Sequence, residues 1–156
     1  MRLRSRRLAI AVTTIGLGMA FLAGTAVGTP GSGITASIIG TGTAVDKVKT
    51  RGNQPYDVVM QTITIAPGGH TGWHTHPGTA VALVTAGELT IYDGNDRSCS
   101  PRIFSAGQVY VDPGYGHVHI GRNEGEVPTE ILVTYLDVPI GGGVRIDADD
   151  PGNCDF

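Results

Sequence analysis

Charged residues are scarce in this chain: they make up 16% of its 156 residues, and aromatic residues contribute only 6%. A coiled coil needs charged positions on both sides of its apolar seam, so this composition excludes one. The sequence also contains no Ser-His-Asp arrangement, no phosphate-binding loop and no signature of paired catalytic carboxylates. No general base can therefore be identified from the sequence.

Glycine and proline are abundant instead, with 24 and nine residues respectively. Both residue types interrupt helices and favour turns, which does not suit a helical bundle. Hydrophobic residues make up 40% of the chain, enough to argue against disorder. The composition and the length therefore predict one small, globular, mostly β domain.

The first 28 residues have the pattern of an export signal. They begin with four arginines, continue with an uncharged apolar stretch over 8–23 and end in small residues. A retained membrane anchor is the alternative, but glycine and threonine dilute the apolar stretch. We expect a cleaved signal over 1–28, in which Ser5-Arg6-Arg7 resembles the start of a twin-arginine signal, then a linker over 29–33 and one domain over 34–156.

Export changes the charge and the expected state of the cysteines. Removing the four arginines leaves seven of the 11 basic residues against 14 acidic ones, a net charge of −7. Such an acidic chain without a basic cluster is a poor nucleic-acid binder, and we expect a secreted protein that has no membrane contact after cleavage. In an oxidising compartment, Cys99 and Cys154 are expected to form a disulfide. Metal ligation and free thiols are the alternatives.

Short apolar runs separated by turns predict the strands. We expect a hairpin turn at Ala86-Gly87 and the end of a strand at Pro67-Gly68-Gly69. Many short strands at such spacing favour a sandwich or a barrel. The expected strands cover residues 37–43, 56–66, 79–85, 88–92, 102–104, 108–112, 117–121 and 129–138.

The five histidines form two groups in the sequence, one over 70–76 and one over 117–119. His74 and His76 are two residues apart, so on a strand their side chains project from the same face, and His117 and His119 repeat this spacing. Two such pairs on facing strands would bring several imidazoles to one point. Imidazole is a common ligand for transition metals.

The glycines around these histidines resemble the two motifs of the cupin family. Gly68, His74, His76 and Gly87 match the spacing of the first motif, although Ala80 stands where that motif has a glutamate, with Val81 beside it. The second motif is matched from Gly107 through Pro113, Gly116 and His119 to Asn123, with one extra residue after Pro113. The resemblance implies an all-β, double-stranded β-helix, the jelly-roll cupin barrel.

The resemblance also implies that His74, His76 and His119 bind a divalent transition metal. Without the glutamate, three neutral imidazoles leave open positions on the metal, which favours iron or copper, with zinc, nickel and manganese as alternatives. His117 is a second candidate for the third ligand, or a substitute for the missing glutamate.

Two further residues near the motifs are expected to have structural roles. His70 is expected to lie in a glycine-rich loop as a hydrogen-bonded residue. Trp73 should point away from the ligand pair and pack in a core.

Two functions are compatible with this pattern. The first is a metal-dependent oxidoreductase, similar to the dioxygenases of the superfamily that use three histidines, acting on a small organic molecule. The second is an extracellular module that binds a metal or a small ligand without catalysis. Many cupins pair through their sheets, so the resemblance also implies a possible homodimer.

Overall fold

The computed structural model describes residues 29–43 and 55–156, so the predicted export signal lies outside the described residues. The described chain forms ten strands, all of them paired antiparallel. Across residues 29–43 and 55–156 there is no helix of the length and apolarity needed to cross a membrane.

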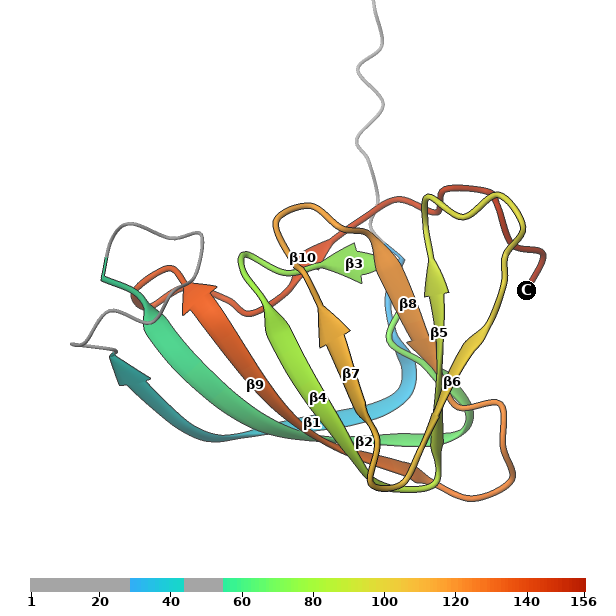
Figure 1. Ribbon diagram of the computed structural model, residues 1–156, viewed down its shortest axis with the longest axis horizontal. Helices are drawn as coiled ribbons and strands as arrows, with labels where there is room; N and C mark the ends of the chain where they lie inside the picture. The colour runs from blue at the N-terminus through green and yellow to red at the C-terminus, as the bar shows by residue number, and fades with distance from the viewer. Residues whose placement is uncertain (1–28, 44–54) are drawn as a thin grey trace, which may run out of the picture.

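The strands form two sheets that face each other as a jelly roll, the double-stranded β-helix that the sequence predicts (Figure 1). The first sheet has the order β1 (Ser32–Thr43), β2 (Asp57–His70), β9 (Thr129–Val138), β4 (Ala80–Ala86) and β7 (Val109–Asp112). The second has the order β6 (Arg102–Ser105), β5 (Glu88–Asp93), β8 (His119–Arg122), β3 (His74–Thr75) and β10 (Ile146–Asp147). One residue pair, His70 with Arg122, joins the two sheets.

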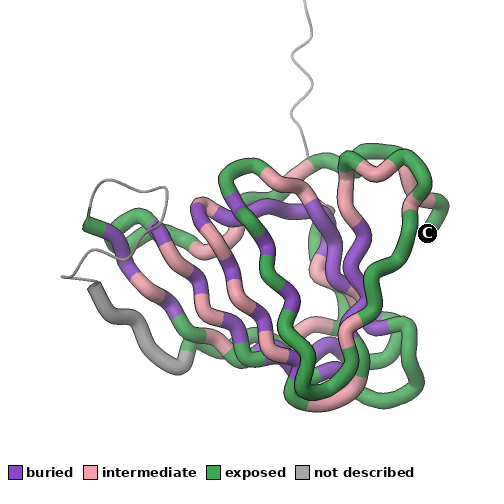
Figure 2. Tube along the Cα trace, in the orientation of Figure 1, coloured by how far each residue is buried: buried purple, intermediate pink, exposed green. Residues whose placement is uncertain are grey.

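The core lies between the sheets because side chains alternate along each strand. Figure 2 shows this alternation as stripes of buried residues between intermediate and exposed ones along β2, β9 and β4. Ile65 and Val84 are fully buried, and Ile131 and Val133 pack beside them from β9. The predicted strand over 129–138 agrees with β9 at both ends.

The predicted hairpin at Ala86-Gly87 is wrong. The strands on either side of this turn, β4 and β5, do not pair; β4 lies between β9 and β7, whereas β5 pairs with β6 and β8. Gly87 has a φ of 69°, and a Cβ there would lie 2.6 Å from the carbonyl oxygen of Pro128. The turn therefore carries the chain from one sheet to the other, close against a neighbouring loop.

Two strands are longer than the sequence predicts. β2 continues through Pro67-Gly68-Gly69 to His70, which therefore ends a strand rather than lying in a loop. A Cβ at Gly69 would lie 2.8 Å from the carbonyl oxygens of Ser32 and Gly33, so the glycine permits a close approach of β1. β1 itself begins at Ser32, within the expected linker.

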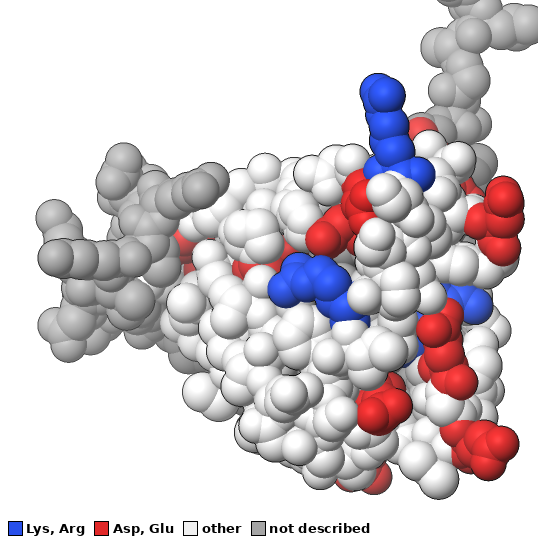
Figure 3. All heavy atoms as spheres, turned by 45° about the vertical axis from the view of Figure 1, so that its right-hand side comes forward, with Lys and Arg blue, Asp and Glu red and all other residues white. Residues whose placement is uncertain are grey.

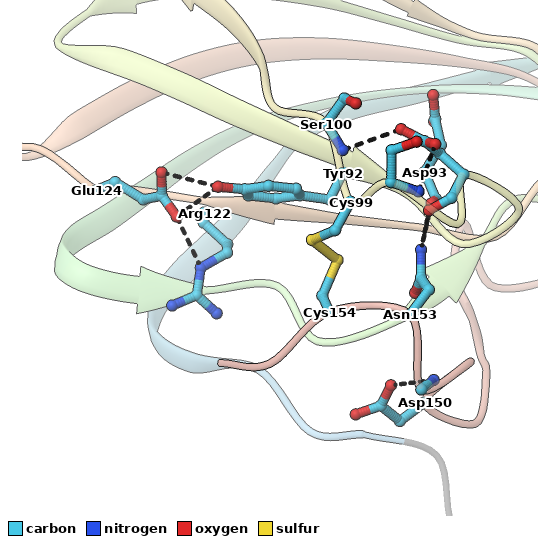
Figure 4. Close-up of a disulfide and its surroundings, with 12 residues drawn as sticks. Tyr92, Asp93, Cys99, Ser100, Arg122, Glu124, Asp150, Asn153 and Cys154 are labelled. Carbon is cyan, nitrogen blue, oxygen red and sulfur yellow. Dashed lines mark hydrogen bonds and ion pairs between the residues drawn. A yellow bond between two sulfur atoms is a disulfide. The ribbon is translucent and has the colours of Figure 1, made fainter.

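A second apolar cluster lies outside the barrel, and we call it the outer cluster. It consists of Trp73, Tyr92 and Ile120, with the Cys99–Cys154 disulfide packed against it. Phe156, at the end of the chain, stacks on Trp73 with ring centroids 6.4 Å apart. Trp73 therefore packs in a core, as predicted, and the cysteines form the expected disulfide (Figure 4).

Candidate metal centre

Strand register brings three histidines together at one end of the barrel interior. His74 in β3 pairs directly with His119 in β8, and His76 follows β3. The ring centroids of these three residues are 4.4–5.3 Å apart, and the possible ligand atoms lie within 4.8 Å of one another. We call this group the histidine cluster. Its three members are about 5% exposed.

Backbone carbonyl oxygens next to the histidine cluster determine which ring nitrogen is available to bind a metal. Nδ1 of His74 lies 2.8 Å from the carbonyl oxygen of Gly72, and Nδ1 of His76 lies 2.6 Å from that of Val144. A carbonyl oxygen only accepts hydrogen bonds, so each Nδ1 must donate its proton. The lone pair of each neutral ring is then on Nε2, the arrangement that metal-binding histidines commonly have.

Burial keeps the three rings in the neutral form that binds metals. Loss of hydration lowers the pKa of His74 well below its ordinary value and lowers that of His76 as well. The same cause, with His76 nearby, lowers the pKa of His119 to about 3. Since each imidazole disfavours a charge on its neighbours, the cluster offers three uncharged donors at neutral pH.

His117 belongs to a second group of possible metal ligands, with Asp112 and with His119, which is a member of both groups. His117 precedes β8 and does not share the strand alternation that the sequence predicts for it. Its Nδ1 lies 2.7 Å from Oδ1 of the fully buried Asp112, and its Nε2 lies 3.1 Å from Oδ1 of Asp93. Asp112 also lies 3.5 Å from Nδ1 of His119. His117 is therefore connected to the histidine cluster through a carboxylate.

His70 lies outside both groups. Its Nδ1 accepts a hydrogen bond from the backbone N–H of Gly72, at 3.2 Å. This contact shapes the turn that leads to β3, so His70 has a structural place in the fold.

The histidine cluster opens onto a cavity inside the barrel. The cavity comprises about 400 Å³ of space, including its opening to solvent, and its walls are mainly aliphatic. Two tyrosines, Tyr110 and Tyr135, line it together with Ala80 and Asp112. Burial raises the pKa of both tyrosines, so their hydroxyls stay protonated and able to donate.

Sequence reasoning missed several of these groups. Asp112 directly precedes Pro113 of the second motif, and its proximity to two histidines in the sequence was the only available signal. The carbonyl oxygens of Gly72 and Val144 have no side-chain signature at all. Val144 lies 68 residues from the His76 that it supports.

Comparison with known proteins agrees with this architecture. A family model described as a cupin domain matches residues 61–135, which include all three members of the histidine cluster. The protein carries a cupin domain. A solved structure of a cupin-2 domain from Rhodospirillum rubrum has the same fold, with a TM-score of 0.50 and 15% identity over 67% of this chain and 60% of that one.

Two plant proteins resemble the cupin domain in sequence. Germin-like protein subfamily 2 member 2 of Arabidopsis thaliana is 33% identical over 97 residues, which are 61% of this chain and 43% of the relative. Germin-like protein 5-1 of Oryza sativa subsp. japonica is 32% identical over 97 residues, 61% of this chain and 42% of the relative. The chain therefore spans less than half the length of these curated relatives.

Proposed function

We propose that the protein is a secreted, metal-dependent oxidoreductase of the dioxygenase type that acts on a small organic molecule. In this proposal His74, His76 and His119 hold one divalent transition metal through Nε2. The observation that carries the proposal is the histidine cluster itself: three buried, neutral imidazoles at the end of an apolar cavity, two of them with Nδ1 held by a backbone carbonyl oxygen.

The donor set fits such a metal. Nitrogen donors suit iron, copper, nickel and zinc better than they suit harder cations, so we favour iron or copper, with manganese less favoured. When bound, the metal would supply Lewis acidity and redox chemistry at the positions that three protein ligands leave open. The protein's own part is to orient the rings of His74 and His76 through Nδ1, to exclude water with aliphatic walls and to offer tyrosine hydroxyls as donors.

The disulfide supports export as part of the proposal. Disulfides persist in oxidising compartments and are rare in the cytosol. The Cys99–Cys154 bond, which fastens the chain end to the outer cluster, therefore agrees with the export pattern of residues 1–28.

Elemental analysis of the purified protein tests the metal site first. We expect about one iron or copper per chain in the wild type, loss of the metal in His74→Ala, His76→Ala and His119→Ala, and retention in His117→Ala. The last variant is the matched control, because His117 shares the neighbourhood but not the histidine cluster. A folded wild-type protein without metal would overturn the proposal, and loss in His117→Ala alone would overturn the assigned ligands.

Oxygen uptake then separates an enzyme from a binding module. We expect the metal-loaded protein to consume dioxygen with at least one member of a panel of phenols, diketones and thiols, and His74→Ala to consume none. A filled metal site without turnover over this panel would favour the alternative, a module that binds a metal or small ligand without catalysis.

A further inference from the structure

A second set of possible metal ligands lies next to the histidine cluster, and we call it the Asp112 group. It consists of Asp112, His117 and His119, and one nitrogen or oxygen atom of each lies within 4.8 Å of those of the other two. Asp112 and His119 are buried, whereas the side chain of His117 is 21% exposed. Because His119 belongs to both sets, its two ring nitrogens can face two different ions.

The Nδ1 atom of His119 lacks the close partner that the other members of the histidine cluster have. In His74 and His76, a backbone carbonyl oxygen lies 2.8 Å and 2.6 Å from Nδ1. Nδ1 of His119 instead lies 3.5 Å from the carbonyl oxygen of His117 and 3.5 Å from Oδ1 of Asp112. These distances exceed those of an ordinary hydrogen bond. A buried ring nitrogen therefore points at the Asp112 group without a short hydrogen bond to hold it.

The carboxylate of Asp112 is oriented toward the two histidines. Its Oδ2 accepts a hydrogen bond from the backbone N–H of Gly114 at 3.0 Å, and its Oδ1 lies 2.7 Å from Nδ1 of His117. Carboxylates that bind metals are commonly held by hydrogen bonds of this kind. Oδ1 is therefore placed where an ion between the two histidines would need it.

His117 has the surroundings of a metal-binding histidine. Its Nε2 lies 3.1 Å from Oδ1 of Asp93. A carboxylate on one ring nitrogen is typical of a histidine that binds a metal through the other, here Nδ1. The side chain of His117 also lines a surface groove between the turn at Gly94 and the chain segment at Asp149, which gives an ion a route from solvent.

We propose that Asp112, His117 and His119 form a second metal site, which binds zinc(II). Histidine nitrogens and a carboxylate oxygen are common zinc ligands, and a water molecule can complete the tetrahedron. Ligand atoms about 2.0–2.1 Å from zinc are about 3.3 Å apart in a tetrahedron. This value lies between the 2.7 Å and 3.5 Å that separate Oδ1 of Asp112 from the two Nδ1 atoms.

The second ion and the metal of the histidine cluster would share His119 as a bridging ligand. The second ion replaces the Nδ1 protons of His117 and His119, which pass to solvent. Since this ion must displace two protons at a partly exposed site, we expect it to bind more weakly than the metal of the cluster. The purified protein would then hold one metal, and a second ion would enter when zinc is added.

Counting metal ions after dialysis against excess zinc tests the second site. We expect two ions per chain in the full-length wild type and one in His117→Ala and in His117→Gln. Asp149→Asn is the matched control, because it removes an exposed carboxylate from the same groove, and it should keep two ions. One ion in the folded wild type, or two in folded His117→Ala, would overturn the second site.

Cobalt(II) in the histidine cluster tests whether His119 is shared. Zinc added to protein that holds one cobalt per chain should shift the visible absorption of the cobalt, because loss of the Nδ1 proton makes His119 a more basic ligand. The absorption should stay unchanged in His117→Ala. Zinc binding without a shift in the wild type would overturn the assignment of His119 as the bridging ligand.

Failure of the second site and failure of the proposed function give different results. His74→Ala removes a ligand of the histidine cluster alone, so we expect it to keep one zinc ion in the Asp112 group. If His74→Ala binds as many ions as the wild type while His117→Ala loses one, the proposed function fails and the second site stands. If His74→Ala binds none and His117→Ala binds as many as the wild type, only the second site is wrong.

Discussion

Trp73 and His74 are neighbours in the chain, yet they belong to two regions that are held together in different ways. His74 points into the barrel and joins the histidine cluster, where neutral rings are oriented by backbone carbonyl oxygens. Trp73 points outward into the outer cluster, where the end of the chain is fastened by a disulfide. One region is a set of polar donors, and the other is an apolar contact with a covalent link.

The difference shows how this fold separates stability from chemistry. Burying imidazoles without charge loses their hydration, so the histidine cluster adds little to the stability of the metal-free protein. The outer cluster buries aromatic surface and restricts the unfolded chain. The two regions meet in the segment before the chain end: β10 pairs with β3, and the carbonyl oxygen of Val144 accepts from His76.

Removing the disulfide should have the largest effect on stability and leave the metal site in place. The bond links residues 55 positions apart. In the chain-entropy model, the double variant Cys99→Ser/Cys154→Ser should lose about 4 kcal/mol of unfolding free energy. Urea denaturation measures the loss, and elemental analysis of the folded variant should still find the metal. Loss of metal from the folded variant would show that the two regions are not separate.

A methyl group at Gly114 should destabilise the loop that follows Asp112, next to the histidine cluster. Gly114 has a φ of 67°, and a Cβ there would overlap the carbonyl oxygen of Gly78. We expect Gly114→Ala to lower the unfolding free energy by about 3 kcal/mol through backbone strain and overlap.

Gly116→Ala is the matched control for this substitution. Its φ is 92°, but a Cβ there has no atom within 4 Å among the described residues. It should cost only about 1 kcal/mol, the strain alone. Equal losses of unfolding free energy for the two variants would rule out the contact with Gly78 as the cause.

Replacing Asp112 should weaken metal binding more than it changes the fold. Its carboxylate lies 2.7 Å from Nδ1 of His117 and 3.5 Å from Nδ1 of His119, behind a predicted ligand. Loss of such a partner lowers metal affinity by about 10- to 100-fold, so we expect Asp112→Asn to bind the metal with a dissociation constant raised by that factor. Metal titration measures it.

Asp93→Asn provides the comparison for Asp112. Asp93 contacts His117, at 3.1 Å, from the side away from Asp112. The Asp93→Asn variant should have a metal affinity within a few-fold of that of the wild type. An effect as large as that of Asp112→Asn would show that the carboxylates act on the site through His117 rather than through His119.

The smallest effect is expected at the chain end. Phe156 is half exposed, stacks on Trp73 and lies under the guanidinium of Arg122, which is 3.9 Å from the ring centroid. Figure 4 shows Arg122 with its other partner, Glu124. Phe156→Ala should lower the unfolding free energy by about 1 kcal/mol and leave the metal content unchanged. Thermal unfolding with and without reductant would show whether this contact matters once the disulfide is broken.

The basic side chains on the surface are scattered. On the face shown in Figure 3, the basic side chains lie apart from one another among acidic ones, so the described residues of this face form no basic cluster.

The sequence by itself indicated the strand content and the outward direction of Trp73, because both follow from alternation along a strand. The members of the histidine cluster were expected from the resemblance to the cupin motifs, since the spacing of the histidines alone left His117 and His119 as alternatives. The prediction of β9 was accurate because the segment is dense in isoleucine, leucine, valine and tyrosine, residues that favour strands.

Only the tertiary structure decided which strands pair and which groups contact Nδ1 of the histidines. The strands on either side of Gly87 were expected to form a hairpin but lie in different sheets, and His117 was expected on a strand but lies before it. Asp112 contacts His117 and His119 from the end of β7, and the carbonyl oxygen of Val144 reaches His76 from 68 residues away. Pairing and support of this kind depend on contacts between residues far apart in sequence, and a backbone carbonyl is the same at every residue, so no local pattern identifies it.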